Sequence, residues 1–428
     1  MIYHNAVKRI LTAPTACDRR TADRFSLLFR YLNLSIKGLS LVKIHGESGK
    51  SACATMLGHA LSANGYRTGA VTTPFSHSMT ECITVDGRPI SMDDFTDCVS
   101  RVCEATATLN REIYELPPLS EEETETLTDT QKTLYAYQKT TEGFSLSADE
   151  ILLASALCYF VKSGCQIAIV EVPTGPRGNA YRLPLAPLVS IVTSTEDPAI
   201  AKTLCGALDR DSGETVSAMQ DREITRIISD KCASINCRLT VPIKNDFYLT
   251  ELAANRLGLF YKGKQYSLNS GAFYQALNLL TVLEALTALK RNGFSVDHAT
   301  ATFQPLFGSA GVPLQFTTVS LSPTIITDFA DTPARRMELA KSLSYHKQIS
   351  QSPVTLIVPD SEDPDEQMAQ PFVEQGFSVI KIIRGDMSNP IRTMKPIVKT
   401  LDPSGTLVIT GPRTFVYELH RALLGLLP

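Results

Sequence analysis

One short stretch holds the residues of this sequence best suited to chemistry: Gly46, Glu47, Ser48, Gly49, Lys50 and Ser51. An apolar run, Leu39 to Ile44, precedes it, and apolar residues at helical spacing, Ala52 to Ala63, follow it. A strand, a glycine turn and a helix cradle phosphate, because the turn exposes backbone N–H groups and the helix start adds partial positive charge. Lys50 would reach the terminal phosphates, and the Ser51 hydroxyl is a candidate Mg²⁺ ligand.

The spacing of this turn differs from that of the Walker loop. Two residues separate Gly46 from Gly49, where the Walker pattern has four. A strand–turn–helix corner with an exposed lysine is therefore the alternative interpretation. The turn and its flanks together favour phosphate binding, and we predict it.

A carboxylate ends a second apolar segment. The run from Gln166 to Val172 reads as a buried strand and contains Glu171 near its end. Ligands bind at the carboxyl ends of strands in open α/β sheets, and a buried carboxylate without a partner is costly. We expect Glu171 to face the Mg²⁺ of a bound nucleotide; a salt bridge to Arg177 is the alternative.

Strands and helices alternate through the rest of the chain, which predicts an α/β fold with largely parallel sheets. Ser91 and Ser147 are expected to cap helices, and residues 246–268 are expected to form β-hairpins. Further strands are predicted at residues 188–193, 239–243, 324–327, 354–358, 377–383 and 406–410. Glycine and proline gather within residues 291–316, so we place a boundary there and expect domains at residues 1–298 and 299–428.

The composition excludes several classes of protein. The 428 residues carry a net charge of −3, which gives no sign of a nucleic-acid or anionic-membrane surface. No apolar run approaches the length of about 18 residues that spans a membrane, and the first residues lack the core of a signal peptide. We expect a cytoplasmic protein with small-molecule partners and neither nucleic acid nor membrane among them.

The order of these features resembles the folylpolyglutamate synthase/dihydrofolate synthase family, a branch of the Mur ligase superfamily, over nearly the whole chain. The family's Gly-Thr-Asn-Gly-Lys turn resembles the glycine turn, and its Glu-Val-Gly-Leu-Gly-Gly-Arg segment resembles the one from Glu171 to Arg177. Its Gln-x-x-Asn helix opening is matched by Gln275 and Asn278, and the aspartate of its Asp-Gly-Ala-His-Asn-Pro motif by Asp328.

Several family residues are replaced. The loop resembling the family's Ser-Pro-His loop, Thr73-Pro74-Phe75, lacks histidine, and Asp197-Pro198 stands for an Asp-His pair. The segment 204–208 has no lysine, the interdomain arginine is missing from Ala310-Gly311-Val312, and the second-domain motif reads Asp328-Phe329-Ala330-Asp331-Thr332-Pro333. Arg335 or Arg336 is a candidate substitute for the missing arginine; surface arginines on a helix are the alternative.

The resemblance implies a Mur ligase-like fold: a P-loop-type parallel-sheet ATPase domain followed by a smaller Rossmann-like α/β domain. It implies ATP and Mg²⁺ as cofactors, with Lys50 and Glu171 catalytic and with Ser51 and Glu171 as metal ligands. The implied nucleotide-binding residues are Gly46, Glu47, Ser48, Gly49, Lys50, Ser51, Gln275, Asn278 and Asp328. The implied reaction adds glutamate to a folate-like acid through an acyl phosphate. A ligase for another acid, and a non-catalytic homologue that binds nucleotide for regulation or partner binding, are the alternatives.

Overall fold

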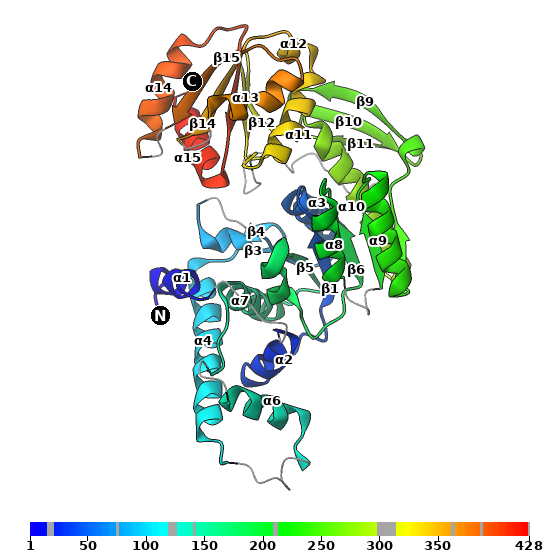
Figure 1. Cartoon of the computed structure of the whole chain (residues 1–428), viewed down its shortest axis with the longest axis vertical. Helices are drawn as coiled ribbons and strands as arrows, with labels where there is room; N and C mark the ends of the chain where they lie inside the picture. Colours follow the sequence, from blue (N-terminus) through cyan, green and yellow to red (C-terminus); the bar gives the residue numbers. More distant parts are fainter. Residues whose placement is uncertain are drawn as a thin grey trace.

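The computed structural model of the chain describes residues 1–14, 21–73, 77–118, 126–139, 143–208, 213–297, 314–360, 364–385 and 388–426. Figure 1 shows two sheet-containing parts, one above the other, with helices α4 (Met92–Glu115) and α6 (Asp129–Gln138) extending away from the lower one. None of the described helices combines the length and apolar character needed to cross a lipid bilayer.

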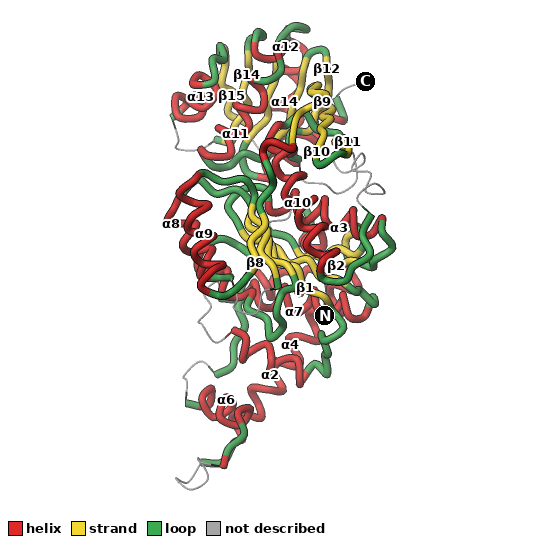
Figure 2. Tube along the Cα trace, turned by 90° about the vertical axis from the view of Figure 1, so that its right-hand side faces the viewer, coloured by secondary structure: helices red, strands yellow, loops and turns green. Residues whose placement is uncertain are grey.

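The first part is built on an eight-stranded sheet. Its strand order is β4-β3-β2-β5-β1-β6-β7-β8. The six strands β2, β5, β1, β6, β7 and β8 are parallel, and β3 and β4 are antiparallel additions at one edge. Helices cover both of its faces (Figure 2). The strands are β1 (Ser40–His45), β2 (Thr68–Val71), β3 (Ile83–Val85), β4 (Arg88–Pro89), β5 (Ile167–Glu171), β6 (Val189–Val192), β7 (Glu214–Ser217) and β8 (Arg238–Thr240).

Alternate strand residues supply the two cores of this sheet, as the two-residue period of a strand requires. Leu41 and Val170 join one core with helices α1 (Tyr3–Leu11), α2 (Thr21–Tyr31), α4 and α7 (Ala148–Lys162). Val42 and Ile169 join the other core with α3 (Lys50–Ala63) and α10 (Phe273–Arg291). Helices α8 (Pro198–Gly206) and α9 (Arg222–Ser234) pack together beside the end of β6.

Two smaller sheets complete the chain. The predicted hairpins form an antiparallel sheet of β9 (Phe247–Ala253), β10 (Arg256–Tyr261) and β11 (Lys264–Leu268). The second part has the order β12-β13-β16-β14-β15 and is parallel except for β12. Its strands are β12 (Thr317–Leu321), β13 (Thr324–Asp328), β14 (Val354–Pro359), β15 (Val379–Gly385) and β16 (Thr406–Thr410).

Helices cover both faces of this last sheet, as a doubly wound α/β fold requires. Helices α11 (Pro333–Ser344), α12 (Lys347–Ser350) and α13 (Asp365–Glu374) share one core, and α14 (Pro390–Thr400) and α15 (Arg413–Leu424) share the other.

The predicted caps and the predicted alternation are confirmed. The Ser91 hydroxyl accepts from the Asp94 backbone N–H at the start of α4, and Ser147 forms a full capping box with Glu150 at the start of α7. The predicted boundary between residues 298 and 299 lies outside the described residues, as do Pro74, Phe75 and the segment Ala310-Gly311-Val312. The two domains, 1–298 and 299–428, therefore stay a proposal.

Several elements were not predicted from the sequence, among them α1, α6, α8, α12 and the three that follow. Strand β7 is polar in composition but fully buried, because the Glu214 carboxylate accepts from Arg291 and from the Thr240 hydroxyl. Strand β12 lies at a sheet edge and is half-buried, so it lacks an apolar run. Helix α14 has one proline at its start and Pro396 inside, which conceals its helical pattern.

Candidate functional site

The glycine turn follows β1, the strand between β5 and β6 in the sheet, and leads into α3. Gly46 and Gly49 have φ angles of +135° and +86°, which side chains disfavour. A Cβ at Gly46 would lie 2.1 Å from the Thr193 Oγ1, and one at Gly49 would lie 2.3 Å from the Asn278 Oδ1. Both glycines are therefore required by the backbone conformation and by close neighbours.

The turn rests on the loop after β6. The backbone N–H groups of Glu47 and Ser48 both donate to the Ser194 carbonyl at 3.1 Å. The first turn of α3 begins at Lys50 and presents its own N–H groups at the carboxyl edge of the sheet. This arrangement can bind phosphate at a helix N-terminus.

The Lys50 side chain folds back over the turn. Its side chain is 9% exposed, and its ammonium group donates to the Gly46 carbonyl at 2.7 Å and to the Thr174 hydroxyl at 3.3 Å. Burial lowers the pKa of Lys50, and the nearby Glu171 carboxylate opposes that shift. A bound anion would likewise favour the charged ammonium.

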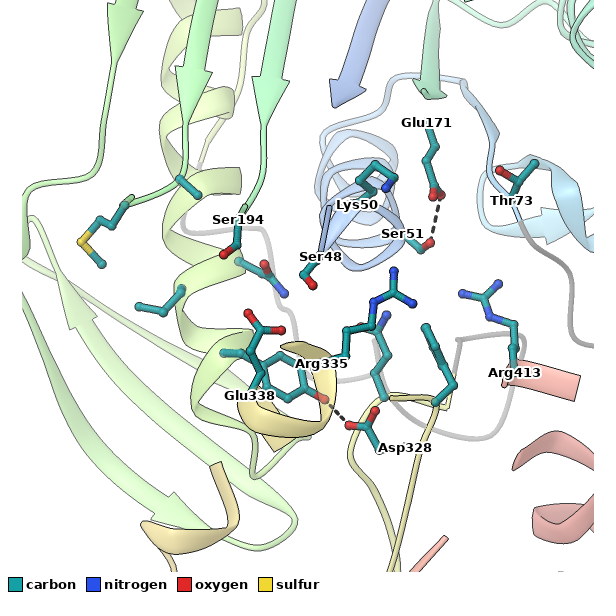
Figure 3. A pocket seen from close by; sticks show the side chains of 18 residues that line it. Ser48, Lys50, Ser51, Thr73, Glu171, Ser194, Asp328, Arg335, Glu338 and Arg413 are labelled. Atoms are coloured by element: carbon teal, nitrogen blue, oxygen red, sulfur yellow. Dashed lines mark hydrogen bonds between the residues drawn. The ribbon is translucent and has the colours of Figure 1, made fainter. Parts of the chain in front are cut away.

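Ser51 and Glu171 meet directly, as the predicted metal site requires. The Ser51 hydroxyl donates to the Glu171 Oε2 at 2.9 Å, and Glu171 is 3% exposed (Figure 3). Burial raises the pKa of Glu171, while Lys50, Ser51 and Arg413 lower it. A hydroxyl and a carboxylate oxygen are hard ligands that fit Mg²⁺ when phosphate oxygens and waters complete the shell.

The alternative partner of Glu171 is wrong. Arg177 donates instead to the Asp149 carboxylate, at 2.8 Å from Nε and 2.6 Å from Nη2. Within the described ranges, no group of three or more histidine, cysteine or acidic side chains is placed to hold a metal ion. The pair Ser51 and Glu171 is thus the candidate for Mg²⁺.

Two predicted residues of α10 have different places. Asn278 lines the cavity beside Gly49, whereas Gln275 is fully buried behind it. Asn278 donates to the Gln275 Oε1 at 3.1 Å, and Gln275 donates to the Gln315 Oε1 at 2.8 Å. Gln275 therefore orients Asn278 rather than lining the cavity.

Asp328 ends β13 and lines the cavity from the second part of the chain. Its Oδ2 accepts from the Tyr274 hydroxyl and, at 2.9 Å, from the Phe316 backbone N–H. Burial raises the pKa of Asp328 to about 7, against the effect of these two hydrogen bonds. The remaining carboxylate oxygen is the one left for a ligand.

Lys50, Ser51, Glu171, Asn278 and Asp328 all line one open cavity (Figure 3). Its walls come from the ends of both parallel sheets and from α3, α10, α11 and α15. One end is lined by Ala218, Met219 and Leu277, and the other by Thr73, Phe329 and Arg413. Gly46 and Glu47 shape the turn but do not line the cavity.

The two candidate arginines are distinguished by the structure. Arg335 lines the cavity and spans the two parts of the chain, since it donates to the Glu47 carbonyl at 3.2 Å and to Asp331 at 2.8 Å. Arg336 is buried, does not line the cavity and donates to the Asp331 carbonyl at 3.4 Å. Arg335 is thus the arginine placed to meet a phosphoryl group.

Sequence reasoning missed two charged residues of the cavity. Arg413 is the first residue of α15, directly after the loop that ends β16; an arginine at the carboxyl end of a parallel strand was an available signal. Glu338 lies on α11. Burial, with a smaller contribution from the nearby Glu196, raises the pKa of Glu338 to about 7. A helical glutamate one and a half turns after a motif carries no such signal.

The chain was compared with known proteins. No family model matches. It is 25% identical over 346 residues to the dihydrofolate synthase/folylpolyglutamate synthase of Mycobacterium tuberculosis, an alignment covering 75% of this chain and 66% of that protein. It is 25% identical over 194 residues to a probable bifunctional folylpolyglutamate synthase/dihydropteroate synthase of Haloferax volcanii, covering 45% of this chain and 20% of that one. The chain thus matches less than two thirds of the length of either relative.

Solved structures match over the whole chain. A folylpolyglutamate synthase in complex with AMPPCP and folate has a TM-score of 0.75 at 19% identity, covering 99% of this chain and all of that one. The Mycobacterium tuberculosis folylpolyglutamate synthase with ADP has a TM-score of 0.74 at 18% identity, covering 100% and 99%. The predicted Mur ligase-like fold and the predicted family resemblance are confirmed.

Proposed function

We propose that this chain, a divergent relative of the folylpolyglutamate synthase/dihydrofolate synthase family, is an ATP-dependent ligase that joins glutamate to a folate-like acid. The observation that carries the proposal is the cavity itself. There the glycine turn, the Ser51–Glu171 pair and Arg335 from the second part of the chain surround the same space. The names of the relatives supply the reaction class and the substrates.

In the proposed complex, ATP would lie across the cavity. The triphosphate would lie on the first turn of α3, with Lys50 released from the Gly46 carbonyl to meet it. The base would reach the apolar end lined by Ala218, Met219 and Leu277. Asn278 and Asp328 would contact the nucleoside from opposite sides, and Ser51 and Glu171 would hold Mg²⁺, which neutralises phosphate charge when bound.

The chain's own groups then position two transfers. A carboxylate oxygen of the acid attacks the γ-phosphorus, and ADP leaves with the bridging oxygen and its electron pair. The glutamate amine next attacks the acyl carbon, phosphate leaves, and the amine proton passes to solvent. Lys50 and Arg335 stabilise the charge on the transferring phosphoryl group, which is the main task of such a site.

One observation favours the alternative, a nucleotide-binding homologue without ligase activity. Asp197 stands where the family has an Asp-His pair, and its carboxylate accepts from the Ala199 backbone N–H at 2.7 Å. The Asp197 carboxylate therefore caps the N-terminus of α8. The resemblance implies that the Asp-His pair supplies a metal ligand, and its histidine is replaced here by Pro198.

ADP release and nucleotide binding test both candidates. The full chain is incubated with Mg-ATP, L-glutamate and a panel of pterin acids, and AMPPCP affinity is measured in parallel by calorimetry. ADP release that requires both acid and glutamate supports the ligase. AMPPCP binding without turnover for any acid supports the alternative.

Lys50→Ala tests the nucleotide site that both candidates share. We expect it to weaken AMPPCP binding at least about 10-fold, because a charge-assisted contact to phosphate contributes about 1.5–3 kcal/mol. Unchanged affinity in the variant, or no AMPPCP binding by the wild type, contradicts both candidates.

A further inference from the structure

Arg413 brings a third cation to the cavity, besides Lys50 and Arg335. Its guanidinium lies over the Phe329 ring, 4.5 Å from the ring centroid, and the Arg335 guanidinium lies 5.8 Å from the same centroid. Both distances are typical of cation–π contacts. Phe329 follows Asp328 directly and stands where the family resemblance has glycine. One aromatic ring therefore holds two like charges at one wall of the cavity.

The position of Arg413 carries an electrostatic cost. Arg413 is 8% exposed and is the first residue of α15, where the helix dipole already places partial positive charge. Burial lowers the pKa of Arg413, the nearby Glu171 opposes that shift, and Arg335 adds to it. Local electrostatics disfavours a buried cation at a helix start near a second guanidinium, and such unfavourable arrangements are expected at functional sites. An anion bound in the cavity would offset these costs.

The place of Arg413 distinguishes it from the groups that meet the nucleotide. Figure 3 shows Arg413 on the side of Thr73, across the cavity from Ser194 and Glu338. The Arg335 guanidinium is held at the glycine turn by the Glu47 carbonyl, whereas Arg413 acts electrostatically on Glu171. Glu171 is the candidate Mg²⁺ ligand, so in the proposed binding mode Arg413 would lie beyond the terminal phosphate and away from the apolar end of the cavity.

We infer that Arg413 binds the carboxylate of the acid substrate and orients it toward the γ-phosphate. The inference rests on the proposed function and adds a residue to it. A carboxylate must lie beside the γ-phosphate before it can be phosphorylated, and a guanidinium is suited to hold it through two parallel N–H···O bonds. The Phe329 ring covers one side of the guanidinium and so limits the directions from which the carboxylate can approach.

Binding of dihydropteroate, which has a single carboxylate, tests the inference without requiring turnover. Affinity is measured in the presence of Mg-AMPPCP for the wild type and for Arg413→Met, with dihydropteroate and with its carboxamide. We expect Arg413→Met to weaken dihydropteroate binding about 10- to 100-fold, as for loss of one charge-assisted pair, with AMPPCP affinity unchanged. The carboxamide should bind the wild type as weakly as dihydropteroate binds the variant, and the variant should not distinguish the two ligands.

Two further variants control for folding and for charge. Arg421→Met removes an exposed arginine from the same helix and should change neither affinity. Arg413→Lys keeps the charge without the planar fork and should give an intermediate affinity; its response to the carboxamide decides the question if Arg413→Met does not fold.

Several outcomes overturn the inference. One is that wild type and Arg413→Met both bind dihydropteroate more tightly than its carboxamide, and by the same factor. Another is that Arg413→Met loses as much affinity for AMPPCP as for dihydropteroate. The third is that the wild type binds no dihydropteroate. Absence of ADP release, with the carboxylate discrimination intact, contradicts the ligase proposal alone.

Discussion

Replacing Gly49 by alanine tests how the turn supports the site. The substitution forces a side chain onto a φ of +86° and places a Cβ 2.3 Å from the Asn278 Oδ1. The left-handed conformation costs about 1–2 kcal/mol. Asn278 must then move and give up its hydrogen bond to Gln275, which costs about another 1 kcal/mol. We expect a loss of about 2–3 kcal/mol in unfolding free energy and AMPPCP binding at least about 10-fold weaker, because the moved side chain lines the cavity.

Gly65→Ala is the matched control, because Gly65 lies just beyond the other end of the same helix. Its φ is +84°, but a Cβ there would have no atom within 4 Å. We expect only the conformational cost of about 1–2 kcal/mol and unchanged AMPPCP affinity. Urea unfolding and calorimetry measure the two quantities. If Gly49→Ala and Gly65→Ala destabilise equally and both bind AMPPCP as the wild type does, the contact with Asn278 has no role and the reasoning fails.

Three further predictions concern buried charges. Glu171→Gln should abolish the Mg²⁺ dependence of AMPPCP binding without lowering stability at pH 7, because the raised pKa of Glu171 means that its buried charge is unfavourable at that pH. Calorimetry with and without EDTA checks the Mg²⁺ dependence, and a loss of unfolding free energy in the variant would contradict the reasoning. Asp328 binds a proton up to about pH 7 when folded but only up to about pH 4 when unfolded, so its contribution to stability falls as pH rises across that interval; Asp328→Asn should flatten the decline seen in urea unfolding between pH 5 and 7.5, and an unchanged slope would refute the assignment. Glu214→Ala removes the buried carboxylate that accepts from Arg291, whose side chain is 32% exposed and stays solvated, so it should cost about 1.5–3 kcal/mol in unfolding free energy while AMPPCP still binds the folded protein; a loss below about 1 kcal/mol would contradict this account of β7.

The sequence predicted best where one residue type has one physical role. Gly46 and Gly49 were recognised because their spacing between strand and helix has few uses, and Glu171 because a carboxylate at the end of an apolar strand needs a partner. Ser91 and Ser147 were recognised as caps because a hydroxyl before an apolar helical pattern satisfies orphan N–H groups.

Other features depend on distant residues and carry no local pattern. Strand β7 could not be recognised without Arg291, which is remote in sequence and donates to the Glu214 carboxylate. Gln275 was expected to contact nucleotide because of the motif it shares with Asn278, but the helix turns it toward Gln315. The contribution of Arg413 depends on Phe329, and their contact across the second sheet cannot be read from either segment alone.

Helix α10 contacts both sides of the cavity within a single turn. Tyr274 donates to Asp328, and Asn278, four residues later on the same face, packs against Gly49. One turn of α10 therefore sets the distance between the phosphate turn and the end of the second sheet. A break in α10 between Tyr274 and Asn278 would therefore separate the two sides of the cavity, even if every residue that lines it were kept.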